Sequence, residues 1–135
     1  PTPHAKMNHV DVVACLALLQ YIFFGSLVGK ARTRYGVKAP ATTGHEQFER
    51  AYRVQMNTLE LLVALLPALY LAGRYWPGPY VAAAGAVYLV GRLLYWRAYV
   101  STPATRGLGF MLSIVPVITL TLAALVPAVL GKPVV

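Results

Sequence analysis

Acidic residues and cysteine are both scarce in this chain. Of its 135 residues, four are Asp or Glu and one is Cys, against twelve Lys or Arg, which gives a net charge of +8. The single cysteine, Cys15, excludes an internal disulfide framework and a multi-cysteine metal site. The three histidines show no metal-ligand spacing either, so we expect no metal site. Charged residues form only 12% of the chain, about half of the usual share in soluble domains, so an ordinary soluble domain is excluded.

What replaces charge is apolar sequence: 58% of the residues are hydrophobic and the mean hydropathy is +0.59. Four apolar stretches each approach the length of about 20 residues that a helix needs to cross a bilayer. Basic residues gather between these stretches and not on one face of a soluble fold, which argues against a nucleic-acid partner. We therefore predict one all-α domain over residues 1–135, an integral membrane four-helix bundle with spans at about 10–29, 48–74, 79–100 and 107–130.

Basic residues divide unevenly between the two ends of the predicted bundle. Loops one and three and the adjoining helix ends carry Lys30, Arg32, Arg34, Lys38, Arg50, Arg53, Arg92, Arg97 and Arg106, and the other side carries Lys6, Arg74 and Lys132. The positive-inside rule then places loops one and three on the cytoplasmic side. We expect the membrane to be a bacterial inner membrane or an endoplasmic-reticulum-type membrane. The first stretch is too long for a cleaved signal peptide, so we interpret it as a span. We assign no chemistry to Lys30, Lys38, Arg50 and Arg97, beyond topology and headgroup contacts.

A polar stripe precedes the second apolar stretch, in "ERAYRVQMNTLELL" at 49–62. Arg53, Asn57 and Glu60 are four and three residues apart and share one helix face, with Gln55 near its edge. Ionisable groups at membrane depth usually face a bundle interior or a wet cavity. A second stripe, on the third helix, has the spacing i, i+4, i+7, i+11 and comprises Tyr88, Arg92, Tyr95 and Tyr99. Together with Arg32 and Arg106 at neighbouring helix ends, these groups are expected to converge on one level of the bundle.

This inventory has two interpretations. Guanidinium groups hold carboxylates or phosphates, a buried glutamate suits an ammonium group, and tyrosines add hydroxyl donors. A ligand with two carboxylates and one amine, such as glutathione, fits; nucleotides and anionic lipid headgroups also satisfy several of the arginines. Alternatively, Arg53, Glu60 and Arg92 form a helix–helix ion network without a ligand. Spacing alone leaves the two interpretations level.

Two segments resemble signatures of the MAPEG family, the membrane-associated proteins in eicosanoid and glutathione metabolism. "TTGHEQFERAYRVQMNTLE" resembles its second-helix signature, and "VYLVGRLLYWRAYVSTPATRG" resembles its third-helix signature. The pattern ERxYRxQxNxxE is specific, whereas helices one and four match mainly by hydropathy. Within the family, the chain is most similar to the branch of leukotriene C synthases and microsomal glutathione transferases of types two and three. The short, basic chain favours a bacterial member.

The resemblance implies a homotrimer with glutathione as co-substrate, bound between subunits near the cytoplasmic face. It implies a set of glutathione-binding residues: Arg32, Arg53, Gln55, Asn57, Glu60, Tyr95 and Tyr99. It also implies Arg106 as the catalytic residue, because an adjacent guanidinium lowers the pKa of a thiol and so forms the nucleophile. Leu61 and Thr33 depart from the pattern, standing where the synthases have a tyrosine and a second arginine. The second departure bears on leukotriene-epoxide specificity, and glutathione binding is less affected.

From this resemblance we expect a membrane-embedded glutathione transferase that conjugates glutathione to hydrophobic electrophiles entering from the bilayer, with lipid-hydroperoxide peroxidase activity as a further reaction of the same thiolate. The alternative is a non-catalytic membrane protein that binds or presents lipid, as in the 5-lipoxygenase-activating-protein branch of the family.

Overall fold

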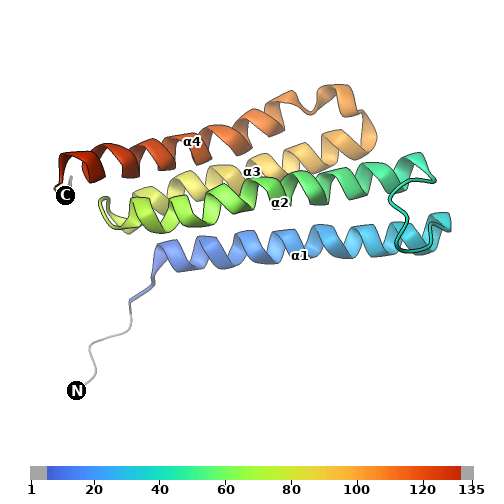
Figure 1. Cartoon of the computed structure of the whole chain (residues 1–135), viewed down its shortest axis with the longest axis horizontal. Helices are drawn as coiled ribbons and strands as arrows, with labels where there is room; N and C mark the ends of the chain where they lie inside the picture. The colour runs from blue at the N-terminus through green and yellow to red at the C-terminus, as the bar shows by residue number, and fades with distance from the viewer. Residues whose placement is uncertain (1–5, 132–135) are drawn as a thin grey trace, which may run out of the picture.

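The computed structural model describes residues 6–131, which form four α-helices and one 3₁₀ turn and contain no β-strand. The helices are α1 (His9–Tyr35), α2 (Glu46–Gly73), α3 (Gly78–Ser101) and α4 (Gly107–Leu130), with the turn η1 (Pro103–Thr105) between the last two. They lie side by side as an antiparallel bundle (Figure 1). The predicted all-α four-helix bundle is confirmed. Lys132, which entered the charge count, lies outside the described residues.

The connections place the two basic loops together. The α1–α2 loop and the α3–α4 connection lie at one end of the bundle, which we call the loop end (Figure 1). The short α2–α3 turn lies at the other end, together with the start of α1 and the end of α4. The side chains at the start of α2, the end of α3 and the start of α4 therefore meet at one level.

Helix α1 continues beyond its apolar stretch before it ends at the loop end. Asn8 caps its start, since the Asn8 side chain accepts a hydrogen bond from the Asp11 amide at 3.1 Å. The polar last turns keep Arg32 and Arg34 on the helix, where cations favour the negative end of the helix dipole. Gly36 then ends the helix at φ 68°, a left-handed conformation that glycine adopts without strain.

Large apolar side chains cover much of the outer surface, as expected for a bundle that faces lipid. Ile22, Val63 and Val129 are 63%, 70% and 76% exposed, respectively. Helices α1, α2 and α4 are each long and apolar enough to cross a membrane. Helix α3, with 24 residues, is long enough as well, but Arg92 and Arg97 within it lower its mean hydropathy. The chain thus has the architecture of an integral membrane bundle.

Candidate functional site

A polar pocket opens at the loop end between α2, α3 and α4. Its volume is about 340 Å³, and its lining residues are Arg53, Asn57, Tyr95, Tyr99, Arg106 and Phe110. This volume lies near the lower end of the range of about 300–1,000 Å³ for small-molecule sites. Five of the eight residues predicted for the site therefore line one cavity within a single chain. Phe110 is an additional member that sequence reasoning missed, because no pattern in the apolar α4 marks it.

Regular helix geometry brings these side chains together. Arg53 and Asn57 are one turn apart on α2, as Tyr95 and Tyr99 are on α3. The two tyrosine rings stack with centroids 5.5 Å apart. Arg106 follows η1 directly and donates from Nη1 to the Pro103 carbonyl at 2.8 Å, and its guanidinium carbon lies 5.8 Å from the centre of the Tyr99 ring. The turn η1 thus aims a cation at the tyrosines.

Arg92 lies completely buried behind this pocket. Its Nε donates to Ser113 Oγ at 2.8 Å, and its Nη1 donates to Asn57 Oδ1 at 2.7 Å and to Thr58 Oγ1 at 3.2 Å. Because these partners come from α2 and α4, Arg92 joins three helices. Its spacing from Tyr95 indicated a shared face correctly, but its partner Ser113 could not be identified from the sequence.

The interpretation as an ion network is wrong for the described part of the chain. Across residues 6–131, the ion pair that forms joins Arg50 to Glu46, and neither Arg53 nor Arg92 pairs with Glu60. Glu60 is instead exposed at the bundle surface, one turn beyond Asn57. The polar stripes therefore do not neutralise one another within the described part of the chain.

Two other predicted residues, one at the end of α1 and one on the face of α2 toward α1, lie outside the pocket. Arg32 donates from Nη1 to the Ala41 carbonyl in the α1–α2 loop at 2.7 Å, and its guanidinium lies 4.7 Å from the centre of the Phe48 ring. Gln55 lies against α1, where a Cβ on Gly25 would stand 2.9 Å from its Nε2. A single chain brings together Arg53, Asn57, Tyr95, Tyr99 and Arg106, but not Arg32, Gln55 or Glu60.

Arg50 has a structural role in addition to its expected place at the membrane surface. It donates from Nη1 to the carbonyls of Val100 at 3.1 Å and Ser101 at 3.2 Å, at the end of α3, and it also pairs with Glu46. The first turns of α2 thereby hold the last turn of α3. Its partners on α3 are backbone carbonyls, which no side-chain pattern could have revealed.

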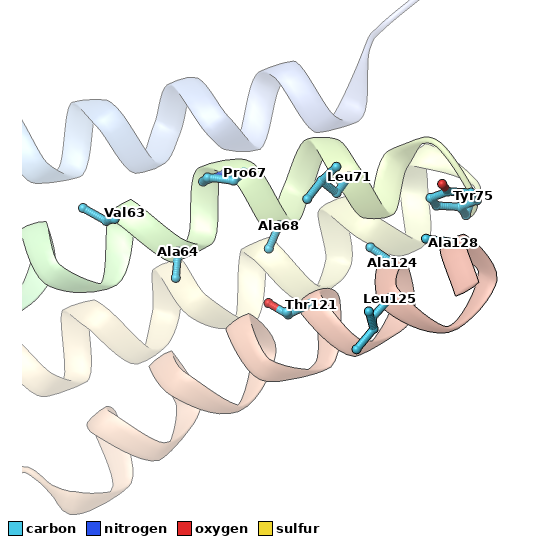
Figure 2. Close-up of a pocket in the computed structure, with 10 residues that line it drawn as sticks. All are labelled: Val63, Ala64, Pro67, Ala68, Leu71, Tyr75, Thr121, Ala124, Leu125 and Ala128. Atoms are coloured by element: carbon cyan, nitrogen blue, oxygen red, sulfur yellow. The ribbon is translucent and has the colours of Figure 1, made fainter. Parts of the chain in front are cut away.

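A second cavity, of about 390 Å³, lies toward the opposite end of the bundle. Figure 2 shows side chains of α2 and α4 facing each other across it, close to the α2–α3 turn. Its lining is almost wholly apolar and comprises Val63, Ala64, Pro67, Ala68, Leu71, Tyr75, Thr121, Ala124, Leu125 and Ala128. The hydroxyl of Thr121 is already bonded to the Val117 carbonyl at 2.8 Å. Of these two cavities, the one at the loop end is lined by charged side chains.

Fold and site together define a class: an integral membrane four-helix protein with a cationic, aromatic pocket at one end. The sequence profile of the MAPEG family matches residues 11–126, and the chain belongs to the MAPEG family. The resemblance of the helix-two and helix-three signatures is thereby confirmed.

Several relatives in the family cover most of the chain. A protein of Synechocystis named only as uncharacterized is 43% identical over 84% of this chain and 83% of its own length. Human microsomal glutathione S-transferase 2 is 38% identical over 82% of this chain and 75% of its own length. Leukotriene C4 synthase of Cavia porcellus is 37% identical over 70% of this chain and 63% of its own length. The predicted branch of the family is thus confirmed.

Proposed function

We propose that this protein is a membrane-embedded glutathione transferase that conjugates glutathione to hydrophobic electrophiles. The main support for this proposal is the polar pocket, in which two guanidinium groups, an amide and two phenols lie at one level of an apolar bundle. The named activities of its relatives, glutathione transfer and leukotriene C4 synthesis, support the same conclusion.

The pocket residues fit the chemistry of glutathione, which has two carboxylates, one amine and one thiol. Guanidinium groups bind carboxylates bidentately, which suits Arg53 at the α2 wall. Tyr95 and Tyr99 offer hydroxyl groups beside apolar ring faces. Arg106, directly after η1, places a positive charge in the pocket. This charge stabilises the glutathione thiolate as the thiol proton leaves to water. The thiolate sulfur then forms a bond to the electrophilic carbon, and the leaving group departs with the electron pair of the broken bond.

We infer that the complete site lies between copies of the chain in a homotrimer. The described pocket lining includes donors for both carboxylates of glutathione but no carboxylate for its amine. Glu60 continues the stripe of Arg53 and Asn57 onto the exposed surface, where a neighbouring copy would cover it. Arg32 and Gln55 lie on the α1 side, so they reach a pocket only from a neighbouring copy.

Conjugation of glutathione to a generic aromatic electrophile by the protein in detergent tests the proposed activity. Arg106→Ala should lower the rate about tenfold or more, because the thiolate loses its neighbouring cation. Arg97→Gln is the matched control, since Arg97 is exposed at the same end and its guanidinium lies over the Trp96 ring, 5.5 Å from the ring centre. Unchanged turnover in Arg106→Ala would remove Arg106 from the mechanism. A lipid hydroperoxide as second substrate tests the peroxidase reaction, in which two glutathione molecules yield one disulfide, an alcohol and water.

A second candidate function is supported by the apolar cavity in Figure 2, whose lining suits an acyl chain. A non-catalytic protein that binds or presents lipid would need this cavity and not the polar pocket. Calorimetry with glutathione in detergent separates the two functions. Binding favours the transferase, and no heat at millimolar glutathione favours the lipid-binding protein.

A further inference from the structure

Arg92 is a buried cation that forms no ion pair with a carboxylate among residues 6–131. Its exposed fraction is 0%, and the ion pair found among residues 6–131 lies elsewhere, between Arg50 and Glu46. A charge at this depth in a membrane protein is costly and is retained where it contributes to function. Here the compensation comes from three neutral oxygen acceptors and from the Tyr95 ring, whose centre is 4.3 Å from the guanidinium carbon.

The two hydroxyl partners can only accept hydrogen bonds from Arg92. Ser113 Oγ donates its own proton to the Gly109 carbonyl at 2.7 Å, and Thr58 Oγ1 donates to the Val54 carbonyl at 2.8 Å. Their lone pairs remain for the guanidinium. The cage around Arg92 is therefore held in one arrangement by backbone carbonyls of α2 and α4, and it fixes the guanidinium between the two helices.

The third partner, Asn57, both bonds to Arg92 and lines the pocket. A guanidinium has only N–H donors, so the Asn57 atom bonded to it must be the carbonyl oxygen Oδ1. The amide nitrogen Nδ2 is then on the opposite branch of a side chain that lines the pocket. We infer that Arg92 is a positioning residue, which orients the Asn57 amide so that its N–H groups face the ligand. This inference rests on the proposed function and concerns how the same site selects its ligand.

An Asn57 amide oriented by Arg92 makes the pocket favour ligands that are rich in hydrogen-bond acceptors. With Asn57 oriented in this way, the amide adds donors beside the guanidinium groups of Arg53 and Arg106. A carboxylate or peptide carbonyl is then favoured at the α2 wall, and an ammonium group is rejected there. Free rotation of the amide would present an oxygen half of the time and lower the affinity for a carboxylate.

Glutathione binding in a double-mutant cycle tests this role. We expect Arg92→Gln to raise the Kd for glutathione about tenfold in the otherwise unchanged protein, and to raise it less than about threefold when Asn57 is already Ala. Thermal midpoints in the same detergent should fall in both backgrounds, because the bonds of Arg92 to Ser113 and Thr58 are lost in each. Arg92→Lys should restore stability better than affinity, since an ammonium cannot bond Asn57 and Ser113 from two sides. Equal increases in Kd in the two backgrounds would show that Arg92 is only structural.

A second readout does not depend on glutathione. In protein labelled with ¹⁵N, the Asn57 side-chain amide should give one sharp pair of proton resonances, and Arg92→Gln should broaden or split them. Thr119→Ala, a substitution on the exposed face of α4, should leave them unchanged. An unaltered Asn57 pair in Arg92→Gln would overturn the positioning role. If the unmutated protein binds no glutathione, the proposed function fails, and these resonances still decide whether Arg92 orients Asn57.

Discussion

Gly109 of α4 lies directly against the backbone of Tyr95 in α3. A Cβ on Gly109 would stand 2.3 Å from the Tyr95 amide nitrogen and 2.6 Å from its Cα. Backbone atoms cannot yield as a flexible side chain does, so the two helices would have to separate. Small residues at helix–helix contacts allow such close approach in membrane proteins. Here the contact lies beside the polar pocket, because Tyr95 and Phe110 both line it.

Gly109→Ala should therefore lower stability and glutathione affinity together. Overpacking of a tight contact costs about 1–3 kcal/mol, and the displaced α4 would carry Phe110 away from Tyr95. Gly107→Ala is the control, since nothing lies within 4 Å of a Cβ at Gly107. Thermal unfolding in detergent and calorimetry with glutathione measure the two effects. A Gly109→Ala protein as stable as the Gly107→Ala control would contradict this account of the contact.

Arg50→Met should loosen the end of α3 while leaving the rest of the bundle intact. Loss of the hydrogen bonds from the Arg50 guanidinium to the Val100 and Ser101 carbonyls should lower the free energy of unfolding by about 1–2 kcal/mol. Tyr99 and Arg106 lie on either side of this segment, so kcat/KM for glutathione should also fall. Lys30→Gln, an exposed substitution at the same end, provides the comparison. If both variants behave alike, Arg50 contributes only to topology.

The pH dependence of conjugation should report the substrate thiol. No carboxylate or histidine lines the described pocket, and arginine stays protonated throughout the working range. Removal of the cation in Arg106→Ala should raise the pKa of the bound thiol, so the rise in rate moves to higher pH. The deficit of the variant is then largest at low pH and shrinks as pH increases. Rate profiles of the two proteins against pH measure this shift, and two parallel profiles would show that Arg106 does not act on the thiol.

Mixed oligomers should reveal whether two copies share one site. Arg32→Gln subunits keep Arg106, and Arg106→Ala subunits keep Arg32. If a neighbouring copy supplies Arg32, co-expression of the two variants should rebuild intact sites and raise activity above that of either variant alone. Each variant mixed with itself is the control. No recovery in oligomers shown to contain both chains would place Arg32 and Arg106 in the same protomer or outside the site.

The helices and most of the pocket follow from local patterns in the sequence. Hydropathy determines which stretches are helical in a bilayer, and the spacing of Arg53 with Asn57, and of Tyr95 with Tyr99, determines which side chains share a face. The partners of Arg92, and those of Arg50 on α3, could not be predicted in this way. Ser113 lies opposite Arg92 because of the rotation of α4, a helix without a polar stripe, and Arg50 binds backbone carbonyls. Both relationships depend on how helices sit against one another.

The cage around Arg92 also constrains how the chain enters the membrane. Its partners come from α2, which is made before α3, and from α4, which is made after it. Until Ser113 has emerged from the ribosome, the Nε of Arg92 lacks its hydrogen-bond acceptor in hydrocarbon. The strongly apolar α4 then offsets the cost of the cation. We therefore expect α3 and α4 to leave the translocon together, as a hairpin, and a chain truncated before α4 to leave α3 outside the bilayer core.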